Sequence, residues 1–233
     1  MNYLFDTKIV VKSPISSVLS STRPYSKAYT LYVTSPMRSP VYMDMEICWH
    51  GRGGQGVVTA SEILAETVVG EDKYVKAFPE FGPERMGAPI RAFTRISEKP
   101  IRVHTQIYEP DIVVVLDGTL IGKVDVAKGL KKGGIILANY PGTPEELKKK
   151  LNTDAECHTL NATKISMEEI GKPVANTSML GALIKLSPIV SYEALEFQIM
   201  SKFTGKLSEK AIKANLSALN RAYKEVQCWI TSI

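Results

Sequence analysis

A glycine-rich segment is the part of this 233-residue chain whose residue types and spacing are best suited to chemistry. Residues Gly51 to Gly56 read Gly-Arg-Gly-Gly-Gln-Gly, which contains the pattern G-x-G-x-x-G. Glycines let the backbone turn tightly and approach a diphosphate, and a helix that begins there supplies N–H donors and a partial positive charge. Arg52 adds a guanidinium, which pairs well with phosphates and carboxylates. The segment predicts a loop that contacts an anion or a partner, with these candidate residues: Gly51, Arg52, Gly53, Gly54, Gln55 and Gly56.

Three interpretations of this glycine loop remain open from the residues alone. A nicotinamide or flavin site needs an acid about 20 residues further on, at the end of the second strand, to hold the ribose. Glu71 and Asp72 precede the expected strand 73–77 and Glu80 follows it, so their placement is poor. The second interpretation is a tight turn without a ligand, and the third is contact with a phosphate, a diphosphate or a partner loop. Hydrolysis of a nucleoside triphosphate is disfavoured, because Val57 follows the last glycine where a lysine would be needed.

A second candidate segment, residues 78–89, holds three prolines and two glycines in twelve residues. This composition predicts an irregular loop, and loops that carry charged and aromatic side chains commonly present a binding surface. Glu80, Glu84 and Arg85 are therefore predicted interface residues for a subunit or a cofactor. The alternative is a loop packed on itself, with Arg85 paired to Glu80 or Glu84.

The sequence contains no evident catalytic or metal-binding set. The cysteines at positions 48, 157 and 228 form no C-x-x-C pair, and the three histidines are equally scattered. A small odd number of cysteines favours a reducing cytoplasm over a disulfide framework. Asp117 and Asn139 end neighbouring expected strands, where open α/β sheets bind ligands, but an acid at such a position more often caps a helix. We therefore expect no catalytic residue and no metal in this chain, and a cytoplasmic location.

The net charge of +5 lies mainly in the first part of the chain. Residues 1–42 carry five basic residues and one acid, so the remaining 191 residues are nearly neutral. A near-neutral body lacks the basic footprint of a nucleic-acid-binding protein. The apolar runs 112–116 and 135–138 have the length of strands, well below the roughly 18 residues of a membrane span. Neither a nucleic acid nor a membrane is expected as a partner.

Alternating strand and helix patterns begin near residue 45. The patterns predict strands over 46–49, 73–77, 90–96, 101–104, 112–117, 134–139 and 157–160. They predict helices over 57–69, 120–130, 144–151, 164–170, 179–185, 192–203 and 208–226, with Thr143 capping the third and residues 176–178 capping the fifth. The strands 90–96 and 101–104 are expected to form a hairpin that turns at 97–100. The prediction is a three-layer α/β/α sandwich with a mixed, mostly parallel sheet, of Rossmann-like class.

Residues 1–42 differ in composition from the rest of the chain. They contain eight serines, four threonines and four prolines, without a sustained helical period. We expect a disordered or loosely ordered extension, which an over-long start would also explain, and a single α/β domain over 43–233.

Several motifs, taken together and in order, resemble the gamma subunits of the pyruvate:ferredoxin oxidoreductase family. They are residues 49–56 (Trp-His-Gly-Arg-Gly-Gly-Gln-Gly), 73–85, 87–89, 111–117 and 176–182. The resemblance covers about residues 45–228, and nothing in residues 1–42 contributes to it.

The resemblance implies a role that composition does not reveal. Enzymes of this family convert a 2-oxoacid and coenzyme A into acyl-CoA and CO2 and pass two electrons to ferredoxin. Their thiamine diphosphate, Mg2+ and [4Fe-4S] clusters belong to other subunits, so this chain is expected to bind no cofactor alone. The implied partners are the alpha, beta and delta subunits of a heterotetramer, with ferredoxin as electron acceptor and coenzyme A as co-substrate.

The resemblance implies that the glycine loop contacts the coenzyme A phosphates or a carboxylate of a partner. It gives Glu84 and Arg85 as the second choice, as interface residues. Which oxoacid is used stays open between pyruvate, branched-chain oxoacids such as 2-oxoisovalerate, 2-oxoglutarate and indolepyruvate, with segment 78–89 most like pyruvate enzymes. A stand-alone nicotinamide or flavin oxidoreductase and a pure assembly module are the alternatives.

Overall fold

The computed structural model describes residues 44–80, 87–103 and 105–228. The predicted extension over 1–42 lies outside these residues. Six strands form one sheet: β1 (Met45–Arg52), β2 (Tyr74–Glu80), β3 (Pro89–Ser97), β4 (Ile112–Val115), β5 (Ile135–Asn139) and β6 (Glu156–Leu160). The helices of the described residues are α1 (Val57–Gly70), α2 (Pro144–Leu151), α3 (Ala162–Glu169), α4 (Asn176–Leu186), α5 (Tyr192–Phe203) and α6 (Glu209–Glu225), with a short 3-10 turn, η1 (Gly118–Leu120).

The sheet is mixed and mostly parallel, as predicted. Its strand order is β2-β3-β1-β4-β5-β6. β3 runs antiparallel to β1 and to β2, whereas β1–β4, β4–β5 and β5–β6 are parallel pairs. All four residues of β4 are buried, which explains its uninterrupted apolar sequence, because a central parallel strand is covered on both faces.

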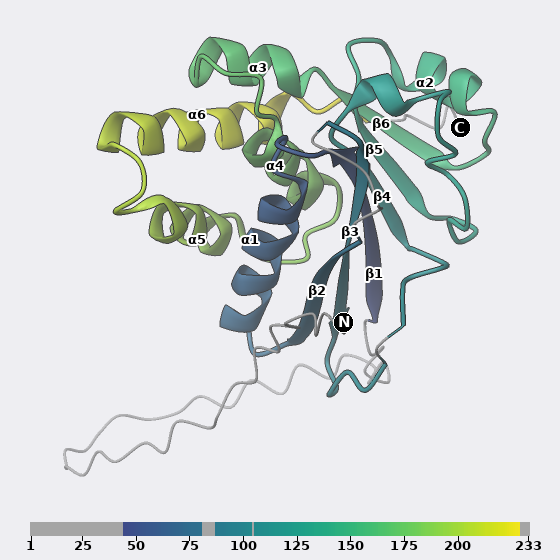
Figure 1. Ribbon diagram of the computed structural model, residues 1–233, viewed down its shortest axis with the longest axis horizontal. Helices are drawn as coiled ribbons and strands as arrows, with labels where there is room; N and C mark the ends of the chain where they lie inside the picture. Colours follow the sequence, from purple (N-terminus) through teal and green to yellow (C-terminus); the bar gives the residue numbers. More distant parts are fainter. Residues whose placement is uncertain (1–43, 81–86, 104, 229–233) are drawn as a thin grey trace, which may run out of the picture.

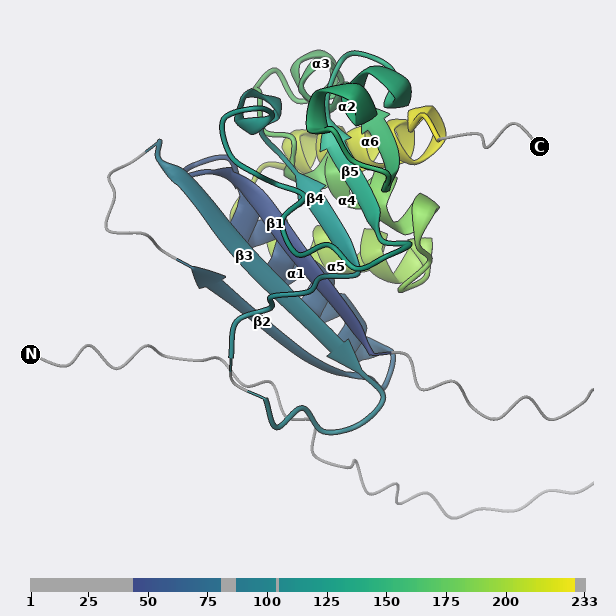
Figure 2. The ribbon, with the colours of Figure 1, turned by 90° about the vertical axis from the view of Figure 1, so that its right-hand side faces the viewer.

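Helices and loops cover the two faces of the sheet unequally. One core cluster joins Ile47 and Trp49 of β1 to apolar side chains of α1 and α3–α6. The other face packs Leu147 of α2 and Leu120 and Val126 of the loop after β4 against the sheet. Figure 1 shows α1, α4, α5 and α6 gathered on one side of the sheet, and Figure 2 shows the strands with these helices behind them. The predicted three-layer α/β/α class is confirmed.

Local signals located most of the helices correctly. Thr143 caps α2 in a capping box: its side chain accepts from the Glu146 N–H, and the Glu146 side chain accepts from the Thr143 N–H. Ser191 and Ser208 cap α5 and α6 through the same kind of side-chain acceptor. Hydroxyls at these positions satisfy N–H groups of the first turn, which have no partner inside a helix.

The predicted capping role of residues 176–178 is wrong. These residues form the buried first turn of α4, and Ala175 is the N-cap. Thr177 Oγ1 donates to Asn215 Oδ1 on α6 at 3.0 Å, and the hydroxyls of Ser178 and Ser166 are 3.2 Å apart. These polar side chains therefore make contacts with other helices and do not cap α4. The local sequence pattern contains no information about such contacts.

The predicted hairpin of 90–96 with 101–104 is also wrong. β3 pairs instead with β2 and β1, residues 101–103 belong to no strand, and residue 104 lies outside the described residues. Alternation identifies a strand but not its partner, and β1 provides a longer partner whose core-facing side chains match those of β3.

The predicted helix over 120–130 does not form. After η1 the chain continues in turns, and Gly122 and Gly129 have φ angles of 80° and 78°. These left-handed conformations cannot be accommodated within a right-handed α-helix. None of the helices in the described parts of the chain is long and apolar enough to cross a membrane.

Candidate functional site

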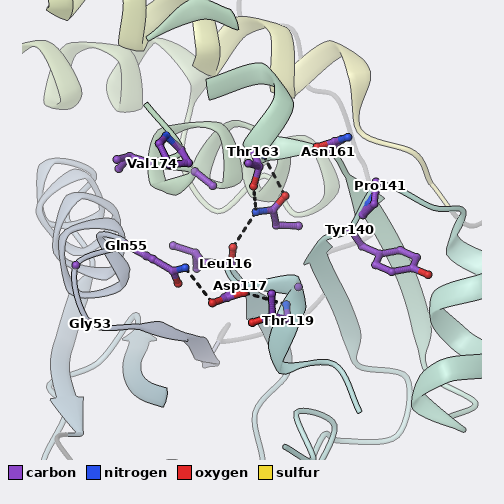
Figure 3. A pocket seen from close by; sticks show the side chains of 15 residues that line it. Gly53, Gln55, Leu116, Asp117, Thr119, Tyr140, Pro141, Asn161, Thr163 and Val174 are labelled. Atoms are coloured by element: carbon purple, nitrogen blue, oxygen red, sulfur yellow. Dashed lines mark hydrogen bonds between the residues drawn. The ribbon is translucent and has the colours of Figure 1, made fainter. Parts of the chain in front are cut away.

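An open cavity of about 730 Å3 lies at the carboxyl ends of β1, β4 and β5. Figure 3 shows Gln55, Asp117, Thr119, Tyr140, Thr163 and Val174 arranged around it. It is lined by Gly53, Gly54, Gln55, Leu116, Asp117, Gly118, Thr119, Asn139, Tyr140, Pro141, Asn161, Thr163, Pro173, Val174 and Ala175.

The topology of the sheet explains the position of this cavity. After β1 the chain turns into α1 on one face, and after β4 it enters the segment that covers the other face. Adjacent parallel strands whose connections leave in opposite directions open a crevice at their carboxyl ends, which is where open α/β sheets bind ligands. The cavity occupies this switch point between β1 and β4.

Three helices begin at the cavity. The loop Gly53–Gln55 leads into α1, Asn161 is the N-cap of α3, and residues 173–175 lead into α4. The amino ends of helices carry partial positive charge and N–H donors, so this arrangement favours a negatively charged group. No lysine or arginine is among the described residues that line the cavity, so in this part of the wall the positive potential comes from main-chain dipoles.

Asp117 organises the wall formed by the glycine loop. Its Oδ1 accepts from the Thr119 N–H at 2.8 Å, and its Oδ2 accepts from Gln55 Nε2 and Arg52 Nε, each at 2.9 Å. Gln55 Oε1 in turn accepts from the Arg52 N–H at 2.8 Å. Burial alone would raise the pKa of Asp117, but the hydrogen bonds from Thr119 and Gln55 and the charge of Arg52 outweigh it and lower the pKa. Asp117 therefore caps η1, as the sequence suggested, and also belongs to the site.

The two segments singled out in the sequence contact each other. The Arg52 guanidinium donates through Nη1 to the Gly87 carbonyl at 3.0 Å, and the Gly53 N–H donates to the Ala88 carbonyl at 3.3 Å. Arg52 Nη2 also lies 3.4 Å from Thr119 Oγ1. The guanidinium thus links the glycine loop to the residues that lead into β3.

The glycines of the loop divide into two kinds. A Cβ at Gly51 would overlap Val57. At Gly56, whose φ is 78°, a Cβ would lie 2.6 Å from Asn176 Nδ2, so Gly51 and Gly56 are needed for the shape of the turn.

The other two glycines, Gly53 and Gly54, line the cavity. A Cβ at Gly53 would meet nothing closer than the Gly87 nitrogen at 3.5 Å. Of the six predicted contact residues, Gly53, Gly54 and Gln55 thus face the cavity.

The predicted interface residue Glu80 ends β2 in a polar cluster. Its carboxylate pairs with Arg91 Nε at 2.6 Å and accepts from Gln106 Nε2 at 2.7 Å. Glu84 and Arg85 lie outside the described residues, so the roles predicted for them stay predictions.

The position of β2 bears on the dinucleotide-binding alternative. The strand that follows α1 is the edge strand β2, which β3 separates from β1, so Glu80 does not take the ribose-binding position of a dinucleotide fold.

One further lining residue was noted in the sequence, whereas several others were not foreseen. Asn139, which was noted at a strand end, accepts through Oδ1 from the Thr163 N–H at 3.1 Å and donates through Nδ2 to the Leu116 carbonyl at 2.9 Å. Tyr140 and Asn161 directly follow β5 and β6, so their polar side chains at strand ends were a signal that could have identified them. No local signal places residues 173–175 at the cavity, since they arrive there through the packing of α4.

A second, smaller cavity of about 430 Å3 lies beside β1 and includes Cys48 and His50 among its lining. Cys48 Sγ and His50 Nε2 are 3.3 Å apart. Burial lowers the pKa of His50 to about 4 and raises the pKa of Cys48 to about 12, so both groups are neutral near pH 7. The described residues contain no cluster of potential metal ligands, and Cys48, Cys157 and Cys228 are free.

Comparisons with known proteins give one consistent result. A family model described as pyruvate ferredoxin/flavodoxin oxidoreductase matches residues 46–225. Over 178 residues the chain is 52% identical to the pyruvate/ketoisovalerate oxidoreductases common subunit gamma of Thermococcus litoralis, with 76% of this chain and 96% of the relative covered. Over 183 residues it is 45% identical to the pyruvate synthase subunit PorC of Thermotoga maritima, with 78% and 95% covered.

Solved structures agree with the sequence relatives. The crystal structure of the pyruvate oxidoreductase subunit PORC from Thermotoga maritima matches with a TM-score of 0.72 and 41% identity, over 80% of this chain and 99% of that one. The 2-oxoglutarate:ferredoxin oxidoreductase from Magnetococcus marinus, solved with 2-oxoglutarate, coenzyme A and succinyl-CoA bound, shares the fold, with a TM-score of 0.65 and 22% identity, over 78% of this chain and 30% of that one.

Proposed function

The chain belongs to the pyruvate ferredoxin/flavodoxin oxidoreductase family, as a gamma-type subunit, and from this membership we propose that it serves a pyruvate:ferredoxin oxidoreductase. The proposed overall reaction converts pyruvate and coenzyme A into acetyl-CoA and CO2, with two electrons passed to ferredoxin. We further propose alpha, beta and delta subunits as partners. Thiamine diphosphate with Mg2+ and the [4Fe-4S] clusters, on those other subunits, supply the carbon chemistry and the electron transfer.

Within this complex we propose that the cavity at the glycine loop contacts coenzyme A. The observation that carries the proposal is the convergence of three helix amino ends on a cavity of about 730 Å3 whose wall includes half-buried Gly53 and exposed Gly54. Coenzyme A carries several phosphate charges, which helix amino ends attract. The Magnetococcus marinus oxidoreductase that shares this fold was solved with coenzyme A bound.

The chain's own contribution is binding and orientation. The partial positive charge at the amino ends of α1 and α4 attracts a phosphate. Asn139 ties the end of β5 to Thr163 at the start of α3 through hydrogen bonds of 2.8 and 3.1 Å. A rigid wall of this kind lowers the entropic cost of holding an extended ligand. No side chain of this chain is assigned to bond making or proton transfer.

Gly53→Ala tests the coenzyme A contact. The backbone at Gly53 is not left-handed and the nearest neighbour of an added Cβ is 3.5 Å away, so the substitution is tolerated by the fold but adds a methyl group to the cavity wall. In the purified complex we expect the KM for coenzyme A to rise about tenfold, with kcat and the KM for pyruvate unchanged.

Gly70→Ala is the matched control, because a Cβ at Gly70 would meet nothing within 4 Å and this residue ends α1 far from the cavity. An unchanged KM for coenzyme A in the Gly53→Ala complex would contradict the coenzyme A contact. The glycine loop would then be a structural turn, in a subunit that serves assembly alone.

A shared role in two oxidoreductases is the second candidate. The Thermococcus litoralis relative is named as a subunit common to pyruvate and ketoisovalerate oxidoreductases. Gentle affinity purification of this chain from its native host, followed by dye reduction with pyruvate and with 2-oxoisovalerate, separates the cases. One set of co-purifying subunits active on pyruvate supports a dedicated subunit, whereas two sets with different oxoacid preference support a shared one.

The same purification tests the remaining predictions. A lone chain that binds a nicotinamide or flavin would overturn the subunit proposal in favour of a stand-alone oxidoreductase. Co-fractionation with cytoplasmic marker proteins would test the location, which is inferred from the sparse cysteines alone.

A further inference from the structure

Asp117 is the hub of a closed set of contacts at the glycine loop. Its Oδ2 receives Gln55 Nε2 and Arg52 Nε at 2.9 Å each, and Gln55 Oε1 receives the Arg52 N–H at 2.8 Å. The Asp117 side chain is 8% exposed, so water competes weakly for these bonds. Figure 3 shows the carboxylate and the Gln55 amide facing each other at the edge of the cavity.

We infer that Asp117 is a positioning residue, which holds the glycine loop in its ligand-binding shape through Gln55 and Arg52; this inference rests on the proposed coenzyme A contact. In this role Arg52 acts as a linker between the carboxylate and the Gly87 carbonyl. The anion is received by the loop backbone around Gly54, which is exposed and lines the cavity, and not by the guanidinium; the N–H groups of Gly53 and Gln55 already donate to the carbonyls of Ala88 and Arg52.

The geometry of the donors explains why a carboxylate is needed. Three donors reach Asp117 from two sides, with the Thr119 N–H on Oδ1 and the Gln55 and Arg52 groups on Oδ2. An asparagine has the same shape but one acceptor oxygen. In either orientation its NH2 group would face a donor, and at least one buried donor would lose its acceptor.

The charge balance supports the linker role of Arg52. The Asp117 carboxylate neutralises the guanidinium at 2.9 Å, and Nη1 is engaged by the Gly87 carbonyl at 3.0 Å. Arg52 does not line the cavity, whereas Gly53, Gly54 and Gln55 do. A ligand would therefore meet the loop backbone before it met the guanidinium.

Asp117→Asn and Arg52→Met in the purified complex test the inference. Each removes the link, so the ligand must order the loop at its own cost, and we expect the KM for coenzyme A to rise about tenfold in each single variant. The double variant should equal the single ones, because both break one link. We expect kcat, the KM for pyruvate and the ionic-strength dependence of the KM for coenzyme A to stay as in the wild type.

Asp111→Asn is the matched control. Asp111 lies directly before β4, at the end of the strand opposite to the cavity, and its carboxylate pairs with Lys131 Nζ at 2.9 Å. It should leave the KM for coenzyme A unchanged. If Asp117→Asn does not assemble, Arg52→Met carries the test through its salt dependence.

Three results would overturn the inference: an unchanged KM in the assembled Asp117→Asn complex, additive losses in the double variant, or a weaker salt dependence in Arg52→Met, which would make the guanidinium a direct anion ligand. An effect of Gly53→Ala without one of Asp117→Asn removes this inference alone. The absence of both effects removes the coenzyme A contact itself.

Discussion

The indole Nε1 of Trp49 donates a hydrogen bond to Oγ1 of Thr94 at 2.9 Å, and neither residue has any exposed surface. The bond joins β1 to β3 on the face that packs against α1, so it crosses the antiparallel pair that interrupts the parallel sheet. A buried indole N–H without an acceptor is costly, and the hydroxyl of Thr94 is what allows a tryptophan at this point of the core.

Thr94→Val removes the acceptor while keeping the shape of the side chain. We expect the free energy of unfolding to fall by about 1–3 kcal/mol, the usual cost of leaving a buried donor unsatisfied. Denaturant unfolding of the purified subunit measures the change. Adding Trp49→Phe to this variant should cost less than Trp49→Phe costs in the wild type, because the orphaned N–H is then gone; simple additivity would contradict the bond.

Gly181→Ala tests the close contact between α4 and α6. A Cβ at Gly181 would overlap the backbone carbonyl of Leu219, which no rotamer change can relieve. We expect a loss of about 1–3 kcal/mol in stability, the typical cost of overpacking. Gly70→Ala, in open space at the end of α1, should be neutral or slightly stabilising in the same thermal-unfolding assay, and equal effects of the two would show that the helices separate freely.

Thr143→Ala tests the capping box of α2. The Thr143 side chain accepts the Glu146 N–H at 3.3 Å, and its loss exposes an unsatisfied donor at the start of an eight-residue helix. We expect about 1 kcal/mol of destabilisation. Thr143→Asn, which retains a side-chain acceptor, should restore most of it. Equal stability of the wild type and Thr143→Ala in thermal unfolding would mean that the cap contributes nothing.

His50 gives the subunit a defined pH dependence of stability. Burial lowers its folded pKa from 6.5 to about 4, with the nearby Arg91 acting in the same direction and Glu80 and Asp125 acting against it. Between these values the unfolded chain binds a proton that the folded chain does not, so stability falls as the pH decreases from 7 to 5, by about 2 kcal/mol for this group.

His50→Gln should therefore lose less stability than the wild type over that range. Unfolding midpoints of both proteins at pH 7, 6 and 5 measure the difference. His158, whose pKa is also lowered by burial, contributes to both proteins and cancels in the comparison. Parallel pH profiles would show that His50 is not held neutral by the fold.

The sequence by itself determined the features that depend on neighbours in the chain. The apolar run of β4 needed only burial on both faces, and the cap at Thr143 needed only the N–H group three residues ahead. The glycine loop between β1 and α1 could likewise be predicted from the sequence, because its turn geometry depends only on neighbouring residues.

The tertiary structure alone decided which distant segments meet. The pairing of β3 with β1 and β2, the turns at Gly122 and Gly129, and the arrival of residues 173–175 at the cavity follow from packing across the sheet. Asp117 could be recognised as a strand-end acid, but its bonds to Gln55 and Arg52 span more than 60 residues of sequence. Local patterns carry no information about such contacts, because the free energy that selects them comes from burying partners that only the folded chain brings together.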